Sequence, residues 1–304
     1  MNRRLLFALG CLLWVFASAG PADHRQLRPI VVCQYNVENY VGEDQHAQGV
    51  RRAKPKSESE ITALIRVIKE INPDILGVSE MGSPERFQDF QARLKAAGLG
   101  YIDSEYVDGP DPDRHLALLS RFPIVARNSV RDLSFPLNGI SEKVRRGFLD
   151  VTVQVNGEYQ LRLVGAHLKS KLGAPQGEAL LRRNEAHLLR AHLNAILLAE
   201  PTLKLLCYGD FNDLKNEPTF HEISGVRGAP GYMADLWLKD SVGDRWTHYW
   251  RAADLYSRID YILASPSVLG TVQLEKSGVY RSDFWNQASD HRPVYATIVP
   301  RNRP

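Results

Sequence analysis

The sequence contains few cysteines and no metal-binding spacing of them. Its 304 residues include only Cys11, Cys33 and Cys207, and no Cys-x-x-Cys pair. This excludes a zinc site with the usual cysteine and histidine spacing. Cys33 and Cys207 could pair in an exported protein, but both lie in apolar runs typical of buried strands. We therefore expect free thiols at both positions.

The sequence also lacks a hydrophobic run long enough to cross a bilayer at its N-terminus. The apolar run over residues 5–16 is too short for a membrane span. A basic pair precedes this run and Ala17-Ser18-Ala19 follows it, which predicts a secretory signal peptide over residues 1–19. A lipoprotein signal at Cys11 is a weaker interpretation, and a buried N-terminal helix is the alternative that stays open.

The sequence also has no large excess of positive or negative charge. The formal net charge is +3, and the loss of Arg3 and Arg4 with the signal peptide lowers it to +1. Overall charge therefore predicts no general affinity for nucleic acid, and any phosphate binding has to come from local clusters. No repeat or linker divides residues 20–304, so we expect a single domain. We expect a secreted or periplasmic monomer, with no stable membrane span after signal cleavage and no obvious protein partner.

Local patterns predict alternating strands and helices. Ser57 and Glu60 form a capping box that begins a helix, which Asn72-Pro73 ends. Asn156-Gly157 predicts a hairpin between residues 148–155 and 159–167. A long helix is expected over residues 176–199, an irregular loop over residues 101–113, and an aromatic loop over residues 246–256. Further strands are expected at residues 30–35, 75–78, 115–120, 204–208, 258–264 and 293–299.

These elements form two β-rich halves, each interrupted by an amphipathic helix. Such an order predicts an α/β fold, a four-layer α/β/β/α sandwich of two mostly antiparallel sheets flanked by helices. Polar residues follow the apolar strands at several points. They are Asn36, Glu38, Glu80, His167, Asp210, Asn212, Asp260, Asp290 and His291. Each alone is typical of a turn, but together they predict an acidic rim with two histidines, whose oxygen ligands suit Mg²⁺ or Mn²⁺ better than zinc.

Six short motifs in a fixed order resemble those of the endonuclease/exonuclease/phosphatase superfamily, in its exonuclease III-like and deoxyribonuclease I-like branches. The similarity spans roughly residues 30–299 and implies the same four-layer sandwich. The motifs are Tyr35-Asn36-Val37-Glu38, Val78-Ser79-Glu80, Gly165-Ala166-His167-Leu168, Tyr208-Gly209-Asp210-Phe211-Asn212, Ser257-Arg258-Ile259-Asp260-Tyr261-Ile262-Leu263 and Ser289-Asp290-His291-Arg292-Pro293-Val294.

The resemblance implies a metal site and its ligands. Glu80 would be the principal metal-binding carboxylate, with Asn36 beside it and with Glu38 and Asp290 binding directly or through water. The ion would be Mg²⁺ or Mn²⁺, with Ca²⁺ as a further option.

The resemblance also implies catalytic roles. Asp260 would hold His291, and Asp210 would orient or deprotonate the attacking water. Asn212 would bind a phosphate oxygen. His167 would protonate the leaving oxygen, with Asp113 as its partner.

Substrate choice is predicted less directly. Trp246 and Trp250 are expected near the substrate, where they either stack on bases or pack on the sandwich rim. Arg145, Arg146 and Lys169 are the candidate phosphate-binding cations. The expected function is a secreted nuclease. The alternatives are a phospholipid or small-molecule phosphoesterase, which the lack of an evident membrane-docking hairpin disfavours, and a non-catalytic binding module.

Overall fold

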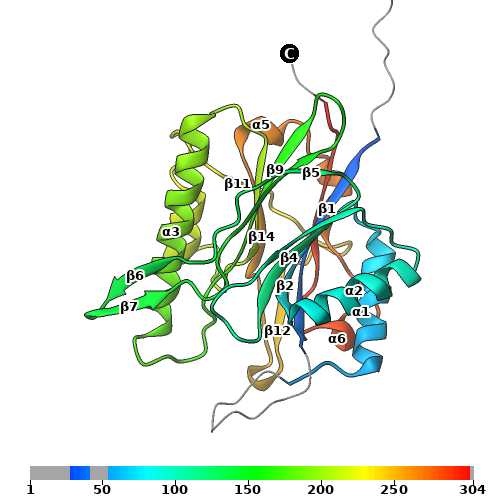
Figure 1. Cartoon of the computed structure of the whole chain (residues 1–304), viewed down its shortest axis with the longest axis horizontal. Helices are drawn as coiled ribbons and strands as arrows, with labels where there is room; N and C mark the ends of the chain where they lie inside the picture. Colours follow the sequence, from blue (N-terminus) through cyan, green and yellow to red (C-terminus); the bar gives the residue numbers. More distant parts are fainter. Residues whose placement is uncertain (1–27, 42–53, 302–304) are drawn as a thin grey trace, which may run out of the picture.

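Two six-stranded sheets lie at the centre of the molecule, with helices against both outer faces (Figure 1). The computed structural model describes residues 28–41 and 54–301. The signal peptide predicted over residues 1–19 lies outside these residues, so it stays a prediction. The expected four-layer α/β/β/α sandwich is confirmed.

The first sheet has the strand order β15-β16-β1-β2-β4-β3. Only β1 and β2 are parallel, and α1 (Glu58–Ile71) forms the crossover between them. Helices α2 (Pro84–Ala96) and α6 (Trp285–Ala288) lie beside α1 (Figure 1). The strands are β15 (Gly278–Val279), β16 (Val294–Ile298), β1 (Ile30–Tyr40), β2 (Ile75–Met81), β4 (His115–Ser120) and β3 (Asp103–Val107).

The second sheet has the strand order β11-β14-β10-β9-β8-β5. Here β9 and β10 are the parallel pair, and α3 (Glu178–Ala199) makes the crossover. All other ladders in both sheets are antiparallel, as predicted. The strands are β11 (Ala234–Asp235), β14 (Asp260–Ala264), β10 (Leu205–Asp210), β9 (Gln160–His167), β8 (Leu149–Gln154) and β5 (Ile124–Arg127), with α4 (Pro218–Ser224) and α5 (Pro266–Leu269) nearby.

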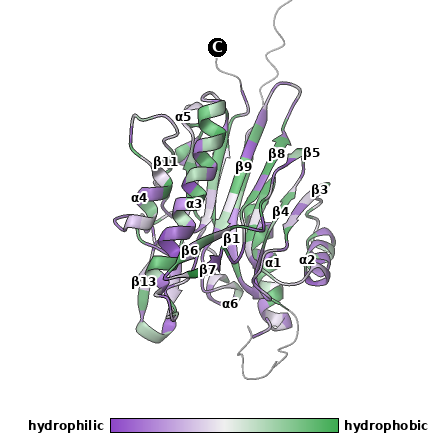
Figure 2. Cartoon of the chain, turned by 60° about the vertical axis from the view of Figure 1, so that its left-hand side comes forward, coloured by the Kyte–Doolittle hydropathy of each residue, from purple (hydrophilic) through white to green (hydrophobic). Residues whose placement is uncertain are grey.

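The core between the sheets is packed so closely that one glycine is required by its neighbour. A Cβ atom on Gly77 of β2 would lie 2.3 Å from the ring of Tyr208 on β10. Tyr208 is buried in the central hydrophobic cluster. Figure 2 shows hydrophobic residues along the central strands and hydrophilic residues on α2. The two sheets therefore have a fixed spacing at this point, close to the strand ends that carry the polar residues.

Several local predictions are confirmed. Ser57 caps α1 through a capping box with Glu60, and Asn72 ends the helix in a left-handed conformation. The hairpin at Asn156-Gly157 joins β8 and β9. Cys33 and Cys207 are both buried and free, as expected. None of the helices in the described part of the chain is long and apolar enough to cross a membrane.

Other local predictions are wrong. The expected irregular loop over residues 101–113 contains β3, and the expected aromatic loop over residues 246–256 is the hairpin of β12 (His248–Trp250) and β13 (Leu255–Ser257). Strand β5 was not predicted, and neither was the hairpin of β6 (Ser134–Leu137) and β7 (Ile140–Lys143), which projects from the sandwich (Figure 1). These strands are short and lie at edges or outside the sheets, so they lack the long apolar runs that identify central strands.

Candidate active site

The predicted polar residues meet where the ends of the two sheets come together. Asn36 on β1 donates from Nδ2 to Oε1 of Glu80 on β2 at 3.3 Å and to Oδ2 of Asp210 on β10 at 3.1 Å. The first bond lies within one sheet, and the second joins the two sheets. The expectation that the strand ends converge is therefore confirmed.

The backbone turns abruptly at three of these positions. Glu38 and Asn39 in β1 have φ values of 50° and 56°, and Glu80 in β2 has a φ of 64°. The pairing register of β1 with β2 shifts at the same point, so these residues form a bulge. Left-handed backbone at residues other than glycine is uncommon and often marks a functional site. Both strands continue past the bulge, so β1 and β2 end later than the sequence predicts.

Three acidic side chains, Glu38, Glu80 and Asp290, line the same cavity beside the bulge. The backbone N–H of Asp290 donates to Oε2 of Glu38 at 3.0 Å. Burial, followed by the nearby charge of Asp290, raises the pKa of Glu38, and Glu80 adds to this effect. The ammonium of Lys56, 3.4 Å from Glu38, compensates only in part. Crowded carboxylates of this kind would be stabilised by a divalent cation, so the residues present fit the predicted metal site.

His291 and Asp260 form a buried pair. Nδ1 of His291 lies 2.8 Å from Oδ2 of Asp260, and Nε2 of His291 lies 3.7 Å from Oδ2 of Asp210. Burial opposes the charged imidazole, but Asp260, Asp210 and Asp290 outweigh it and raise the pKa of His291 well above its usual value. Burial and then the charge of Asp260 raise the pKa of Asp210 to about 7. Asp210 and His291 are therefore placed so that a proton can pass between them, with Asp260 holding the imidazole ring.

The pKa of the second histidine, His167, is shifted in the opposite direction from that of His291. Nε2 of His167 lies 3.6 Å from Asp210 and 3.9 Å from Glu80. Burial, followed by the charge of Arg146, lowers the pKa of His167 well below its usual value. The lowered pKa favours the neutral form of this histidine.

Asp113 was predicted as the partner of His167. It lies in the loop before β4, where its backbone N–H donates to Asp111 at 3.1 Å. Nδ1 of His167 has no hydrogen-bond partner among the described residues, and its pairing with Asp113 stays a prediction.

Asn212 follows β10 and has a φ of 53°. Its backbone N–H donates to Oδ1 of Asp210 at 2.9 Å, and its Nδ2 donates to the carbonyl of Leu168 at 3.0 Å. These bonds fix its amide at the cavity wall. Gly209 permits this corner, because a Cβ there would lie 1.8 Å from the carbonyl oxygen of Ala166.

A cavity of about 430 Å³ opens above these groups. Its floor is acidic and includes His167 and His291, while its wall carries apolar side chains. The apolar lining residues are Leu172, Leu214, Trp250, Leu255 and Ile259. Leu172, Trp250 and Leu255 are at least half exposed.

The cations on the cavity wall differ from those predicted. Arg114 and Lys171 line the cavity, whereas Arg145, Arg146 and Lys169 do not. Arg146 is buried in an ion pair with Asp111 at 3.1 Å. The ammonium of Lys169 donates to the carbonyls of Ser170 and Leu172 at 3.0 and 2.7 Å. These cations were predicted because they lie next to the motifs in the sequence. Their position in the sequence does not show that the side chains of Arg146 and Lys169 already form an ion pair and hydrogen bonds within the fold.

The two predicted tryptophans have different surroundings. Trp250 lines the cavity and is 51% exposed. Trp246 contacts the rings of Tyr256 and Trp285 at centroid distances of 4.7 and 5.0 Å, with the guanidinium of Arg292 over its face. Trp246 therefore packs on the rim of the sandwich, whereas Trp250 faces the cavity and its stacking on a base stays a prediction.

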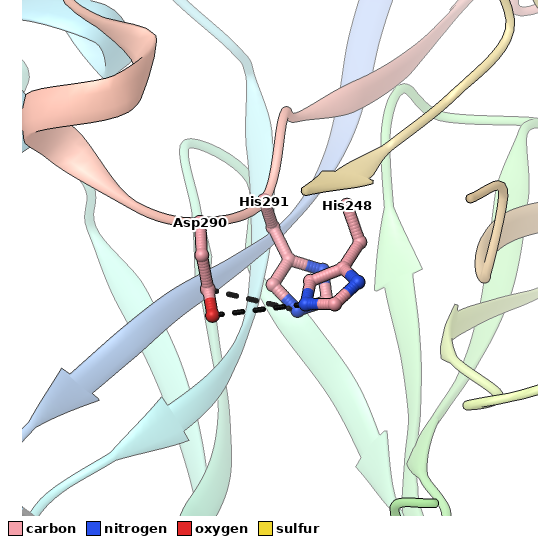
Figure 3. Close-up of side chains that lie close together, drawn as sticks. All are labelled: His248, Asp290 and His291. Carbon is pink, nitrogen blue, oxygen red and sulfur yellow. Dashed lines mark ion pairs between the residues drawn. The ribbon is translucent and has the colours of Figure 1, made fainter. Parts of the chain in front are cut away.

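Two site residues were missed. Nε of Arg114 lies 3.4 Å from Oε2 of Glu80 and donates to Oδ1 of Asn39 at 2.8 Å. His248, at the start of β12, lies beside Asp290 and His291 (Figure 3). Arg114 was missed because it follows an irregular loop and belongs to none of the six motifs. His248 lies within an aromatic run, in which Trp246 and Trp250 are the more conspicuous candidates.

Comparison with known proteins agrees with this geometry. A sequence model described as the endonuclease/exonuclease/phosphatase family matches residues 33–291. No curated protein matches the sequence significantly.

Solved structures share the fold at low sequence identity. The catalytic domain of human nocturnin with bound sulfate is 21% identical, with a TM-score of 0.63 over 88% of this chain and 93% of that one. Truncated TDP2 from Caenorhabditis elegans is 17% identical, with a TM-score of 0.59 over 89% and 97%. An endonuclease/exonuclease/phosphatase protein from Beutenbergia cavernae is 21% identical, with a TM-score of 0.60 over 90% and 72%.

Proposed function

Because this chain belongs to the endonuclease/exonuclease/phosphatase family, it is a metal-dependent hydrolase of phosphoester bonds, and we propose that its substrate is a phosphodiester of nucleic acid. The observation that carries the proposal is the composition of the cavity. Its floor holds an acid–base pair and crowded carboxylates, whereas its wall holds Trp250 and the cations Arg114 and Lys171. A nucleotide matches this division, since its phosphate is anionic and its base is a flat apolar ring.

The metal would be held by Glu80, Glu38 and Asp290, with Asn36 beside them. A bound divalent cation would neutralise the negative charge that develops on the phosphoryl oxygens. The oxygen-rich set supports Mg²⁺ or Mn²⁺. Asn36 also positions Glu80, because its amide donates to that carboxylate.

The proton transfers would use both histidines. The oxygen of water attacks phosphorus, and the proton of that water passes to the deprotonated form of His291, whose resulting positive charge Asp260, Asp210 and Asp290 stabilise. Asp210 orients the water, and Asp260 fixes the ring of His291. The bond from phosphorus to the leaving oxygen breaks. The negative charge of bound phosphate would raise the pKa of His167, which then donates a proton to that oxygen.

A specific observation favours phospholipid as a second candidate substrate. The β12–β13 hairpin presents Trp250, Leu255 and Tyr256, each about half exposed. No membrane-docking hairpin is evident in the sequence, yet an exposed apolar hairpin beside a phosphoesterase site could contact a lipid surface. We place nucleic acid first because Arg114 and Lys171 lie within the cavity, where a phosphate backbone would contact them.

The test is a substrate panel with purified protein. Single-stranded DNA, RNA, plasmid DNA, sphingomyelin vesicles and a chromogenic phosphodiester are incubated with Mg²⁺ or Mn²⁺. The proposal expects cleavage of nucleic acid and of the chromogenic diester. Hydrolysis confined to vesicles would favour the lipid candidate, and no turnover of any substrate would favour the non-catalytic binding module. Export, proposed from residues 1–19, is tested by N-terminal sequencing of protein recovered from periplasm or medium.

A further inference from the structure

One group of possible metal ligands includes a histidine that the family motifs do not contain. Nε2 of His248 lies 3.7 Å from Oδ2 of Asp290, and Nε2 of His291 lies 3.8 Å from Oδ1 of Asp290. One ligand atom from each of the three residues lies within 4.8 Å of the others. Figure 3 shows the three side chains pointing toward one another, His248 from the hairpin and the other two from the loop before β16.

The backbone holds His248 in this position. The hairpin forms an antiparallel bridge between His248 and His291. The N–H of Tyr249 donates to the carbonyl of Asp290 at 2.9 Å, and the N–H of Arg292 donates to the carbonyl of Thr247 at 2.6 Å. The hairpin strand is therefore bonded directly to the segment that carries Asp290.

The imidazole ring of His248 is also oriented. Its Nδ1 lies 3.4 Å from the hydroxyl of Ser257, on the other strand of the hairpin. Histidines that bind metals commonly have such a partner on the second ring nitrogen. Nε2 is thereby left facing Asp290 and the cavity.

The distance between Nε2 of His248 and Oδ2 of Asp290 suits two ligands of one cation better than a hydrogen bond. At 3.7 Å the two atoms are too far apart for a hydrogen bond. Two ligand atoms that are each about 2.1 Å from one ion lie roughly 3.0 Å apart in octahedral coordination and roughly 3.4 Å apart in tetrahedral coordination. A shift of a few tenths of an ångström would allow both atoms to bind a single cation.

We propose that His248 is a ligand of the divalent cation held at Asp290, so that this site offers a nitrogen donor besides its carboxylate oxygens. The inference rests on the metal dependence in the proposed function. An imidazole ligand favours Mn²⁺ or Zn²⁺ over Mg²⁺, which prefers oxygen ligands and retains water. His291, whose Nε2 also faces Asp210, is left for proton transfer.

The test measures metal binding without substrate. Calorimetry gives the Kd values of Mn²⁺ and Mg²⁺ for the wild-type protein and for His248→Phe, and electron spin echo spectroscopy detects nitrogen bound to Mn²⁺. We expect the substitution to raise the Kd of Mn²⁺ by about tenfold or more, to change that of Mg²⁺ less, and to weaken the nitrogen signal. His187→Phe is the control, because the side chain of His187 is 71% exposed on α3 and pairs with Glu222.

His248→Asn serves as a second variant, since it keeps a polar side chain if phenylalanine disturbs the hairpin. Equal Mn²⁺ and Mg²⁺ effects, or an unchanged nitrogen signal in both variants, would overturn the inference while leaving the phosphodiesterase proposal intact. Wild-type protein that binds no divalent ion and cleaves no substrate would refute both.

Discussion

Nδ1 of His291 lies 2.8 Å from Oδ2 of Asp260, and the two side chains are 6% and 0% exposed. His291 precedes β16 of the first sheet, and Asp260 begins β14 of the second. The pair therefore exists only when the two sheets are packed together. Formation of the acid–base site is coupled to formation of the core.

Asp260→Asn should lower kcat by a factor of about 10² to 10⁴, because the ring of His291 loses its orienting carboxylate. The substitution also removes a negative charge that raises the pKa of His291. If His291 must be deprotonated to act, the acidic limb of the pH–rate profile should shift to lower pH. The measurement is kcat/KM against pH, with the exposed Asp283→Asn as the control. An unshifted acidic limb would contradict this role of the pair.

Glu80→Gln should weaken cation binding and lower activity by roughly 10²- to 10³-fold, since one charged ligand becomes neutral. EDTA should abolish the activity of the wild-type protein, and added Mn²⁺ should restore it. Glu275→Gln, at an exposed position, controls for the loss of one surface charge. Activity that survives exhaustive chelation would argue against the metal site.

Trp250→Ala should raise KM for single-stranded nucleic acid by roughly 5- to 100-fold, the loss expected for one stacked base. KM for a small chromogenic diester should stay close to the wild-type value, because that substrate does not reach the hairpin. Trp237→Ala is a matched control, since Trp237 is also 51% exposed. Equal effects on both substrates would indicate that Trp250 supports the fold of the hairpin instead.

Asp150→Asn should destabilise the protein at pH 7 by about 3–5 kcal/mol, because the change breaks a buried ion pair. Asp150 is fully buried and accepts two hydrogen bonds from Arg162, at 2.7 and 2.6 Å. Burial alone would raise the pKa of Asp150, but the bonds from Arg162 and His192 outweigh it and lower the pKa.

The pH dependence of this effect follows from the lowered pKa. A carboxyl group with a lower pKa in the folded state stabilises the protein above its unfolded pKa of about 4, and this contribution is lost as the pH falls through the folded value. Urea unfolding at several pH values should therefore show the gap between wild type and Asp150→Asn narrowing below about pH 4. A gap that is independent of pH would show that the carboxylate charge is not the cause.

Gly209→Ala should destabilise the protein by at least about 3 kcal/mol. The φ of Gly209 is 146°, and its new Cβ would overlap the carbonyl oxygen of Ala166 on the neighbouring strand. Gly157→Ala is the control, because no atom lies within 4 Å of the corresponding position. Thermal unfolding of both variants provides the comparison, and similar melting temperatures would contradict the steric argument.

Local physics explains which parts of the fold could be predicted. The capping box at Ser57 and Glu60 and the turn at Asn156-Gly157 depend on neighbouring residues alone, and both were predicted correctly. Long apolar runs identified the central strands. The edge strand β3 and the hairpin of β6 and β7 were missed, because their strands are short and lack long apolar runs, although Asn138-Gly139 between β6 and β7 is the same turn dipeptide as Asn156-Gly157.

The sequence by itself determined the residue types of the site and their order along the chain. Asp210, Asn212, Asp260 and His291 all follow or begin apolar strands, and the packing of two sheets brings such strand ends to one edge. Only the tertiary structure decided which neighbours complete the site. Arg114 and His248 reach it through a loop and a hairpin, whereas Trp246 and Arg146 are used in packing and in a buried ion pair. The left-handed backbone at Glu38 and Glu80 likewise depends on strand pairing, because a short local sequence does not specify a bulge that forms between strands far apart in the chain.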